Sequence, residues 1–134
     1  MQTKSVLTSA DVKKIAAAAE AEALANNWAV AIAIVDDGGH LLSFHRLDGA
    51  APISSHIAPA KAKTAAMGRR ETKIYEDIVN NGRTSFVTVP YIDGLLEGGV
   101  PIVYEGQVIG AVGVSGVKSE QDAQIAKAGI AALV

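Results

Sequence analysis

The chain has no cysteine and very few aromatic residues. Among its 134 residues, tryptophan occurs once, phenylalanine twice and tyrosine three times. The absence of cysteine excludes disulfides, thiolate zinc sites, iron–sulfur clusters, covalently attached c-type haem and a cysteine nucleophile. Because 49% of the residues are hydrophobic but only 4% are aromatic, the core must consist of Ala, Val, Ile and Leu. Such small side chains each bury little area, which favours stabilisation by self-association.

An excess of charge of one sign is also absent. Twelve Lys and Arg against fourteen Asp and Glu give a net charge of −2, and no basic run occurs, so the electrostatic footprint of a nucleic-acid-binding protein is missing. No window is long and apolar enough to span a membrane, and residues 1–5 do not lead into a signal-peptide core. We therefore expect a cytoplasmic protein without nucleic-acid or membrane partners, folded as a single domain over residues 1–134.

Helical signals occur in four places. Thr8 to Asn27 carries an apolar stripe at helical spacing, with Thr8 or Ser9 as the N-cap and Asp11 in the first turn. His56 to Arg69 predicts a second helix, with Pro59 in its first turn. The remaining predicted helices are Thr72 to Asn80 and a last helix that begins at Ser119.

Strand signals lie between these helices. Trp28 to Val35 is an unbroken apolar run typical of a central strand, and the turn Asp36-Asp37-Gly38-Gly39 joins it to a strand over His40 to Arg46. A second hairpin turns at Glu105-Gly106. The other predicted strands are Thr84 to Val89, stopped by Pro90, and the two arms of the second hairpin, Val100 to Tyr104 and Gln107 to Val114. This order of elements indicates an α+β fold in which helices pack on an antiparallel sheet in three layers.

Six stretches, in order along nearly the whole chain, carry a resemblance to a known family. They are Val35–Leu42, Lys61–Ala66, Gly68–Thr72, Asn80–Thr84, Glu97–Pro101 and Ile109–Gly116. On these stretches the chain resembles the GlcG/HbpS family, also called the haem-degrading domain. The resemblance implies a profilin-like α/β/α fold with a five-stranded antiparallel sheet and helices on both faces. It also implies a homo-oligomer, from a dimer up to an octamer.

The resemblance also carries expectations about function. Some members of the family bind haem and others belong to catabolic operons. It implies a small-molecule-binding protein connected with the utilisation of glycolate or glyoxylate. Because no nucleophile, metal-ligand set or redox group is identifiable, any catalysis would be proton transfer. Two alternatives stay open: a haem-binding or haem-sensing module, and an accessory subunit of a glycolate-oxidising enzyme.

The run Glu97-Gly98-Gly99 places a carboxylate beside consecutive backbone N–H groups, which can hold an anion or a developing oxyanion. We predict Glu97 as the acid–base or orienting group, with Gly98 and Gly99 as hydrogen-bond donors to a small acid. The alternative is a glycine turn with a solvated glutamate.

Three side chains are candidates for binding the carboxylate of such an acid. Lys61 and Thr64 are three residues apart on a predicted helix and share a face, where they present a cation and a hydroxyl. The guanidinium of Arg46 suits bidentate carboxylate recognition. The alternatives are a solvated lysine, a threonine used in helix packing, and an ion pair between Arg46 and Asp48.

Ser115 ends the run Gly113-Val114-Ser115-Gly116. The run is not a nucleophile elbow, because Val117 stands where the second glycine is needed. It is not a phosphate loop either, because the required lysine is missing. Ser115 is a candidate hydrogen-bond donor to the ligand, and a turn serine bonded to the backbone is the alternative.

The three histidines, His40, His45 and His56, have spacings that match no metal signature, so we expect no metal site. One histidine is enough for an axial haem ligand, so haem stays open as a cofactor. His56 lies near the start of the Lys61 helix and is therefore included among the ligand-binding candidates. His40 falls in a hairpin turn, where exposure is the simplest expectation.

Overall fold

The structure is a computed structural model and describes residues 1–133. Its α-helices are α1 (Ser9–Ala25), α2 (Ser54–Gly68), α3 (Thr72–Asn80) and α4 (Ser119–Ala131), and a 3₁₀ helix, η1, covers Thr84–Thr88. Its strands are β1 (Ala31–Asp36), β2 (Leu41–Arg46), β3 (Gly99–Tyr104) and β4 (Gln107–Ser115). The predicted α+β class is confirmed.

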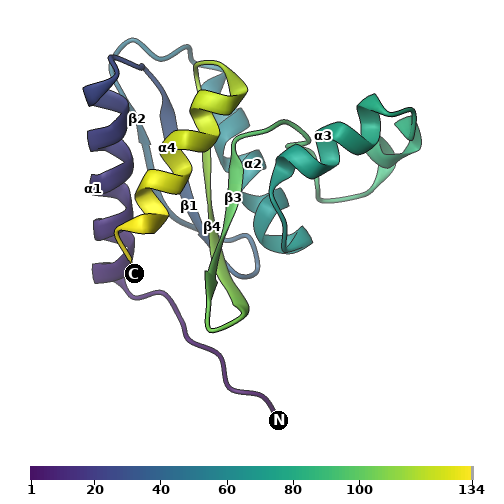
Figure 1. Ribbon diagram of the computed structural model, residues 1–134, viewed down its shortest axis with the longest axis horizontal. Coiled ribbons are helices and arrows are strands. Elements are labelled where there is room, and N and C mark those ends of the chain that lie inside the picture. The colour runs from purple at the N-terminus through teal and green to yellow at the C-terminus, as the bar shows by residue number, and fades with distance from the viewer. Residues whose placement is uncertain (134) are drawn as a thin grey trace.

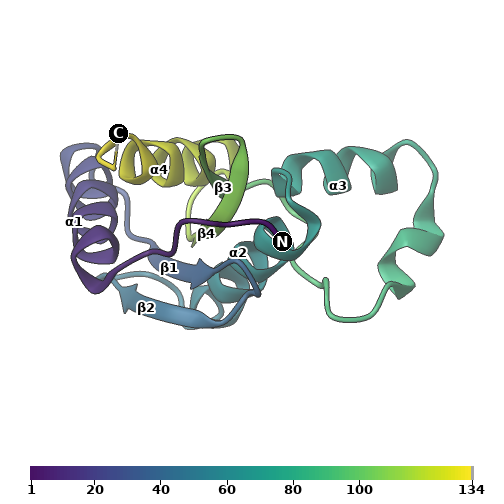
Figure 2. The ribbon, with the colours of Figure 1, turned by 90° about the horizontal axis from the view of Figure 1, so that it is seen from below.

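The four strands form one antiparallel sheet in the order β2-β1-β4-β3 (Figure 1). Both predicted hairpins are present, and β1 and β4, which are far apart in sequence, pair at the centre of the sheet. Helices α1 and α4 pack on one face of the sheet and α2 packs on the other. Helix α3 and η1 lie outside these layers, in a part of the chain that projects away from the sheet (Figure 2).

The two faces of the sheet are packed with different side chains. On the α1/α4 face, strand residues such as Ile32, Ile34 and Val112 meet Ile15 and Ile125 of the helices. On the α2 face, the buried set consists of alanines and Val35. Small side chains let α2 lie close to β4, and a Cβ added at Gly113 would overlap the carbonyl oxygen of Ala58. The aromatic-poor composition therefore serves close helix–sheet contact.

Local signals predicted the start of α1 and the first turn. Thr8 is the N-cap of α1, where its Oγ1 accepts from the N–H of Asp11 at 3.2 Å while the Asp11 carboxylate accepts from the N–H of Thr8 at 2.8 Å. In the β1–β2 turn, Asp36 Oδ1 accepts from the N–H groups of Gly38 and His40, both at 2.9 Å.

Helix α2 begins at Ser54 rather than at the predicted His56. Pro59 therefore lies inside the helix and not in its first turn.

The prediction of five strands is wrong, because Thr84 to Val89 forms no strand. The segment is the 3₁₀ helix η1, in which Thr88 Oγ1 donates to the carbonyl of Ser85 at 2.7 Å. Phe86 packs on Tyr75 of α3, with ring centroids 5.3 Å apart. A strand needs a neighbour to pair with, and this segment lies away from the sheet edge. β propensity alone therefore did not decide its structure.

Candidate functional site

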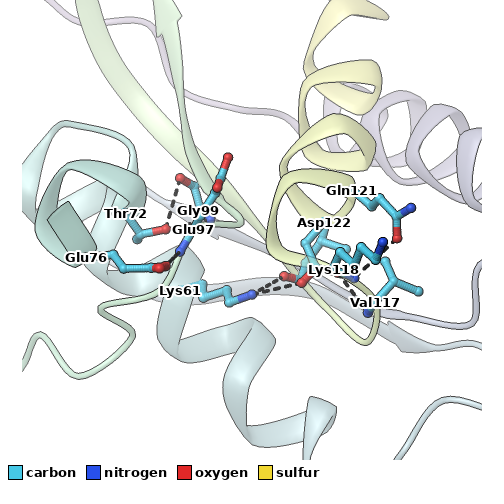
Figure 3. Close-up of polar contacts among 10 residues, drawn as sticks. Lys61, Thr72, Glu76, Glu97, Gly99, Val117, Lys118, Gln121 and Asp122 are labelled. Carbon is cyan, nitrogen blue, oxygen red and sulfur yellow. Dashed lines mark hydrogen bonds and ion pairs between the residues drawn. The ribbon is translucent and has the colours of Figure 1, made fainter. Parts of the chain in front are cut away.

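Lys61 and Asp122 form a buried ion pair at one end of the sheet (Figure 3). Lys61 comes from α2 and Asp122 from α4, so the pair joins helices that pack on opposite faces of the sheet. Lys61 Nζ lies 3.1 Å from Asp122 Oδ2 and donates to the carbonyl of Val114 at 2.9 Å. Both side chains are only 3% exposed. The cation predicted to meet a ligand is therefore already paired inside the protein.

Asp122 was not predicted as a site residue, and nothing in its local sequence marks it as buried. Burial raises the pKa of its carboxyl, an effect opposed by the charge of Lys61 and by the N–H of Val117. That N–H donates to Asp122 Oδ1 at 3.2 Å. Asp122 thus accepts hydrogen bonds through both oxygens, as a buried carboxylate must to avoid a large desolvation penalty.

Gly98 and Gly99 leave space for this pair. Gly98 has φ +133°, and a Cβ there would lie 2.7 Å from Lys61 Nζ and 2.7 Å from the carbonyl oxygen of Val114. A Cβ at Gly99 would overlap the carbonyl oxygen of Lys61. The paired glycines therefore allow the backbone to pass close to the Lys61 side chain and the α2 backbone.

Of the two amides predicted to donate to an acid, that of Gly99 already has an acceptor within the protein, and so has the preceding amide of Glu97. The N–H of Glu97 donates to Glu76 Oε1 at 2.8 Å, and the N–H of Gly99 donates to Thr72 Oγ1 at 2.8 Å (Figure 3). The Gly99 amide is therefore not a free donor, and Gly98 as a donor stays a prediction. Thr72 and Glu76 are the residues that sequence reasoning missed. The carboxylate of Glu97 is half-buried and makes no hydrogen bond within residues 1–133.

Lys61 and Thr64 do share the inward face of α2, as their spacing predicted. Thr64 is fully buried, and its Oγ1 accepts from the N–H of Gly94 at 3.1 Å. It therefore anchors the segment before β3. Its hydroxyl has no opening toward solvent through which a ligand would reach it.

Arg46 and Ser115 lie on the same face of the sheet, on either side of Ala31. Ala31 pairs with Arg46 of β2 and with Ser115 of β4, so all three side chains point toward α2. Two interstrand spacings separate Arg46 from Ser115, which places their Cα atoms about 10 Å apart. The guanidinium of Arg46 is exposed, lies 3.5 Å from Ser55 Oγ and has no carboxylate partner within the described residues. The ion pair with Asp48 is not formed.

Glu97 lies at this same end of the sheet, next to β4 on the β3 side, whereas Arg46 lies on the β2 side. Gly98 continues the β3–β4 ladder, because its carbonyl accepts from the N–H of Val114 at 3.0 Å. The chain at Glu97 is therefore level with Ser115. His56 is exposed in the first turn of α2, next to Ser55. The structure thus brings Arg46, Ser115, Glu97 and His56 to one end of the sheet, with Lys61 buried beneath it.

The other two histidines have different surroundings. His40 Nδ1 lies 3.0 Å from Asp36 Oδ1 in the exposed β1–β2 turn. His45 lines a groove of about 340 Å³ at the C-terminal end of α1, together with Leu24 and Trp28. Its Nδ1 lies 4.0 Å from Glu20 Oε2. Within residues 1–133, no three His, Asp or Glu side chains gather as metal ligands would.

The model of the family described as "Haem degrading protein HbpS-like" matches residues 7–131. The chain belongs to this family. The sequence resemblance is thereby confirmed over nearly the whole length of the chain.

Relatives of known sequence and structure agree with this assignment. The chain is 58% identical to "Protein GlcG" of Escherichia coli K12 over 115 residues, which are 86% of this chain and 85% of that protein. The solved structure of Klebsiella pneumoniae protein ORFY has a TM-score of 0.91 and 33% identity, covering 99% of this chain and 94% of that one. A structure entitled "PduOC:Heme Complex" has a TM-score of 0.86 and 31% identity, covering 96% and 95%.

No helix within residues 1–133 combines the length and the hydropathy that a membrane crossing requires.

Proposed function

We propose that this HbpS-like protein binds a small hydroxy- or oxo-acid, such as glycolate or glyoxylate, at the end of the sheet where Arg46 and Ser115 face α2. One observation carries the proposal: Arg46 is an exposed guanidinium without a carboxylate partner in residues 1–133, on the same face as the hydroxyl of Ser115. The 58% identity to GlcG agrees with the family resemblance, which implies a connection with glycolate or glyoxylate utilisation.

Each residue at this end has a distinct role in the proposal. Arg46 pairs with the carboxylate of the acid, since a guanidinium offers two parallel donors. Ser115 donates to the hydroxyl or oxo group, and Ser55 and His56 border the carboxylate. Glu97 accepts from the ligand hydroxyl and is the group that would move a proton if the protein is an enzyme.

Lys61, Thr64, Gly98 and Gly99 support this end of the sheet from below in the proposal. Lys61 is held by Asp122 and Val114, and Thr64 by Gly94. These residues therefore position β4 and the segment before β3, which carry Ser115 and Glu97.

Thermal unfolding tests this proposal. At a ligand concentration about tenfold above the dissociation constant, binding adds about 1.4 kcal/mol to the free energy of unfolding, which raises the Tm by about 5 °C. We expect glycolate or glyoxylate to give this shift, and Arg46→Gln to abolish it. The matched control is Arg69→Gln, which removes an exposed guanidinium at the opposite end of α2. A flat response of the unmodified protein to every small acid would contradict the proposal and leave the haem-binding and accessory-subunit hypotheses.

Haem is a second candidate ligand, favoured by the groove that contains His45. The groove offers one imidazole, enough for an axial ligand, beside the apolar side chains of Leu24, Trp28 and Leu47; its lining also includes Glu20, Asn27 and Asp48. Glu20 Oε2 lies 4.0 Å from Nδ1, beyond hydrogen-bond distance, so within residues 1–133 the ring has no hydrogen bond that would occupy either nitrogen. Bound haem would supply an iron centre able to sense or bind small ligands.

Haemin titration separates the three histidines. We expect a Soret band on adding haemin to the unmodified protein, a marked loss of that band in His45→Ala, and an unchanged band in His40→Ala and His56→Ala. Absorption spectra at matched protein concentration give the measurement. A band that survives in His45→Ala would show that this groove does not hold the iron.

We also propose that the protein is a homo-oligomer, as membership of the family implies. The many small core side chains support this, because each buries little apolar area within one chain. Large apolar side chains also stay exposed within residues 1–133, among them Leu41, Ile53, Val87 and Tyr91.

A further inference from the structure

A cavity of about 410 Å³ lies in the part of the chain that projects from the sheet (Figure 2). Three stretches border it: α3, the 3₁₀ helix η1, and residues 92–96, which return toward β3. Its volume falls within the range of small-molecule sites, about 300–1,000 Å³. Arg46, Ser115 and Glu97 are not among its lining residues. The cavity is therefore separate from the proposed acid site.

The walls of the cavity are aliphatic. Val79 comes from α3 and Val87 from η1, and the returning segment contributes Ile92, Leu95 and Leu96. Val87 is 60% exposed and Leu96 is 47% exposed, so much of this apolar surface meets water in the single chain. Within residues 1–133 no aromatic ring lines the cavity. Such walls favour a saturated hydrocarbon group over a flat ring that would stack on aromatic side chains.

The charged groups of the lining are all negative. Glu76 and Asn80 lie four residues apart and share one face of α3, and Asp93 comes from the returning segment. Within residues 1–133 neither carboxylate forms an ion pair, and no Lys, Arg or His side chain borders the cavity. Two carboxylates without a counter-charge thus lie beside an aliphatic wall.

The cations of the projecting segment have other partners. Lys73 Nζ donates to the two carboxylate oxygens of Asp77 at 3.1 and 3.3 Å. This hydrogen bonding raises the pKa of Lys73, with smaller contributions from the charges of Glu97 and Glu76. The guanidinium of Arg83 lies over the ring of Phe86, 5.4 Å from its centroid. Neither cation lines the cavity, so its negative charge is left for a ligand.

The cavity is held in shape by contacts around it. Glu76 Oε1 accepts from the N–H of Glu97 at 2.8 Å, which fixes the side chain to the end of the returning segment. Tyr75 of α3 is 3% exposed and packs on Phe86 of η1, with ring centroids 5.3 Å apart. The carboxylate and the apolar walls are therefore in place before a ligand arrives, which lowers the entropic cost of binding.

We propose that this cavity binds a small aliphatic ammonium ion, that is, a protonated alkylamine. Its alkyl chain packs against the valine and leucine walls, and its ammonium group donates to Glu76 and Asp93. An ammonium group has three donors and no acceptor, which suits charged groups that only accept. A carboxylic acid would meet like charges here. The inference goes beyond the proposed acid site, which selects a ligand of the opposite charge.

A homologous series of alkylammonium ions tests the proposal. We expect ethyl-, butyl- and hexylammonium to shift the backbone amide resonances of the lining residues saturably in heteronuclear NMR spectra of the full chain. Affinity should rise by up to about fourfold for each added methylene that the walls bury. Hexanoate, which has the same chain length and the opposite charge, should give no saturable shift at these residues.

Isosteric substitutions test the two carboxylates. Glu76→Gln keeps an oxygen that can accept from the N–H of Glu97, and Asp93→Asn keeps the shape of the side chain. Each should weaken the binding of hexylammonium by about two- to fivefold. The matched control is Asp37→Asn, which removes an exposed carboxylate from the β1–β2 turn and should leave the affinity unchanged.

A valine substitution tests the wall. Val87→Ser should weaken hexylammonium more than ethylammonium, because only the longer chain reaches enough apolar surface to lose it. Its matched control is Val103→Ser, at a 53% exposed valine of β3 outside the cavity. Circular dichroism of each variant verifies folding.

Three results would overturn the proposal. The first is the absence of saturable shifts at α3, η1 and the returning segment, as expected if a second copy covers the cavity. The second is equal affinity for hexylammonium and hexanoate, which would show that the carboxylates do not select the ligand. The third is equal weakening by Asp37→Asn and Asp93→Asn, which would assign the effect to net charge. The response to glycolate enters none of these results, so the two proposals fail independently.

Discussion

Replacing Lys61 with methionine is expected to lower the free energy of unfolding by about 3–5 kcal/mol, because the substitution leaves the carboxylate of Asp122 buried without its counter-charge. Asp122 is 3% exposed at its side chain and 3.1 Å from Lys61 Nζ. The carbonyl of Val114 also loses a donor. Urea unfolding followed by circular dichroism measures the loss.

A matched exposed pair gives the control for this experiment. Lys73 and Asp77 on α3 also lie 3.1 Å apart, but both side chains are more than half exposed. Lys73→Met is expected to change stability by about 0.5 kcal/mol or less, since exposed ion pairs contribute little. Equal losses in the two variants would show that burial does not determine the role of Lys61.

The loss caused by Lys61→Met should depend on pH. Burial already raises the pKa of Asp122 above its usual 3.8, and removing the lysine removes the charge that opposes this rise. A carboxyl with a raised folded-state pKa holds its proton more tightly when folded, so stability falls as pH rises from the unfolded value through the folded one. The deficit should therefore be smaller near pH 4 than near pH 7. Lys61→Met/Asp122→Asn should remove this pH dependence and recover much of the stability.

The sequence predicted the elements whose signals are local. The cap at Thr8, the turn at Asp36 and the hairpin at Glu105 depend on residues a few positions apart, and each is confirmed. The strands β1, β2, β3 and β4 were also found, because apolar runs bounded by glycine turns identify strands without reference to the rest of the fold. The order of these elements indicated the layers, and the family model that matches residues 7–131 confirmed the family resemblance.

The missed features depend on contacts between distant residues. Asp122 is 61 residues from Lys61, so its place in the first turn of the last helix gave no sign of a buried ion pair. Thr84 to Val89 has strand-forming residues, but whether a strand forms depends on a neighbour that only the tertiary fold supplies. Paired glycines are equally ambiguous, because an anion site and a close backbone approach require the same lack of a side chain.

Gly98→Ala decides between those two explanations of the glycine pair, and we expect it to cost about 3–5 kcal/mol of stability. The residue has φ +133°, which strains any side chain, and a Cβ would lie 2.7 Å from both Lys61 Nζ and the Val114 carbonyl oxygen. Gly106→Ala is the matched control: its φ is +76°, but nothing lies within 4 Å of an added Cβ. Gly106→Ala should therefore lose only about 1–2 kcal/mol of stability, the cost of placing a side chain in a left-handed backbone conformation.

Combining Gly98→Ala with Lys61→Met tests whether the glycine serves the ion pair itself. If Gly98 is needed because the Lys61 side chain passes beside it, removing the ammonium relieves one of the two close contacts of the new Cβ. The losses of the two single variants should then sum to more than the loss of the double variant, by about 1 kcal/mol or more in urea unfolding. Strict additivity would assign the requirement to the Val114 carbonyl and the backbone angle alone. A double-variant loss smaller than the sum of the two single-variant losses would show that Gly98 and the Lys61 ammonium act as one structural unit. This unit positions β4 and the candidate site at its end.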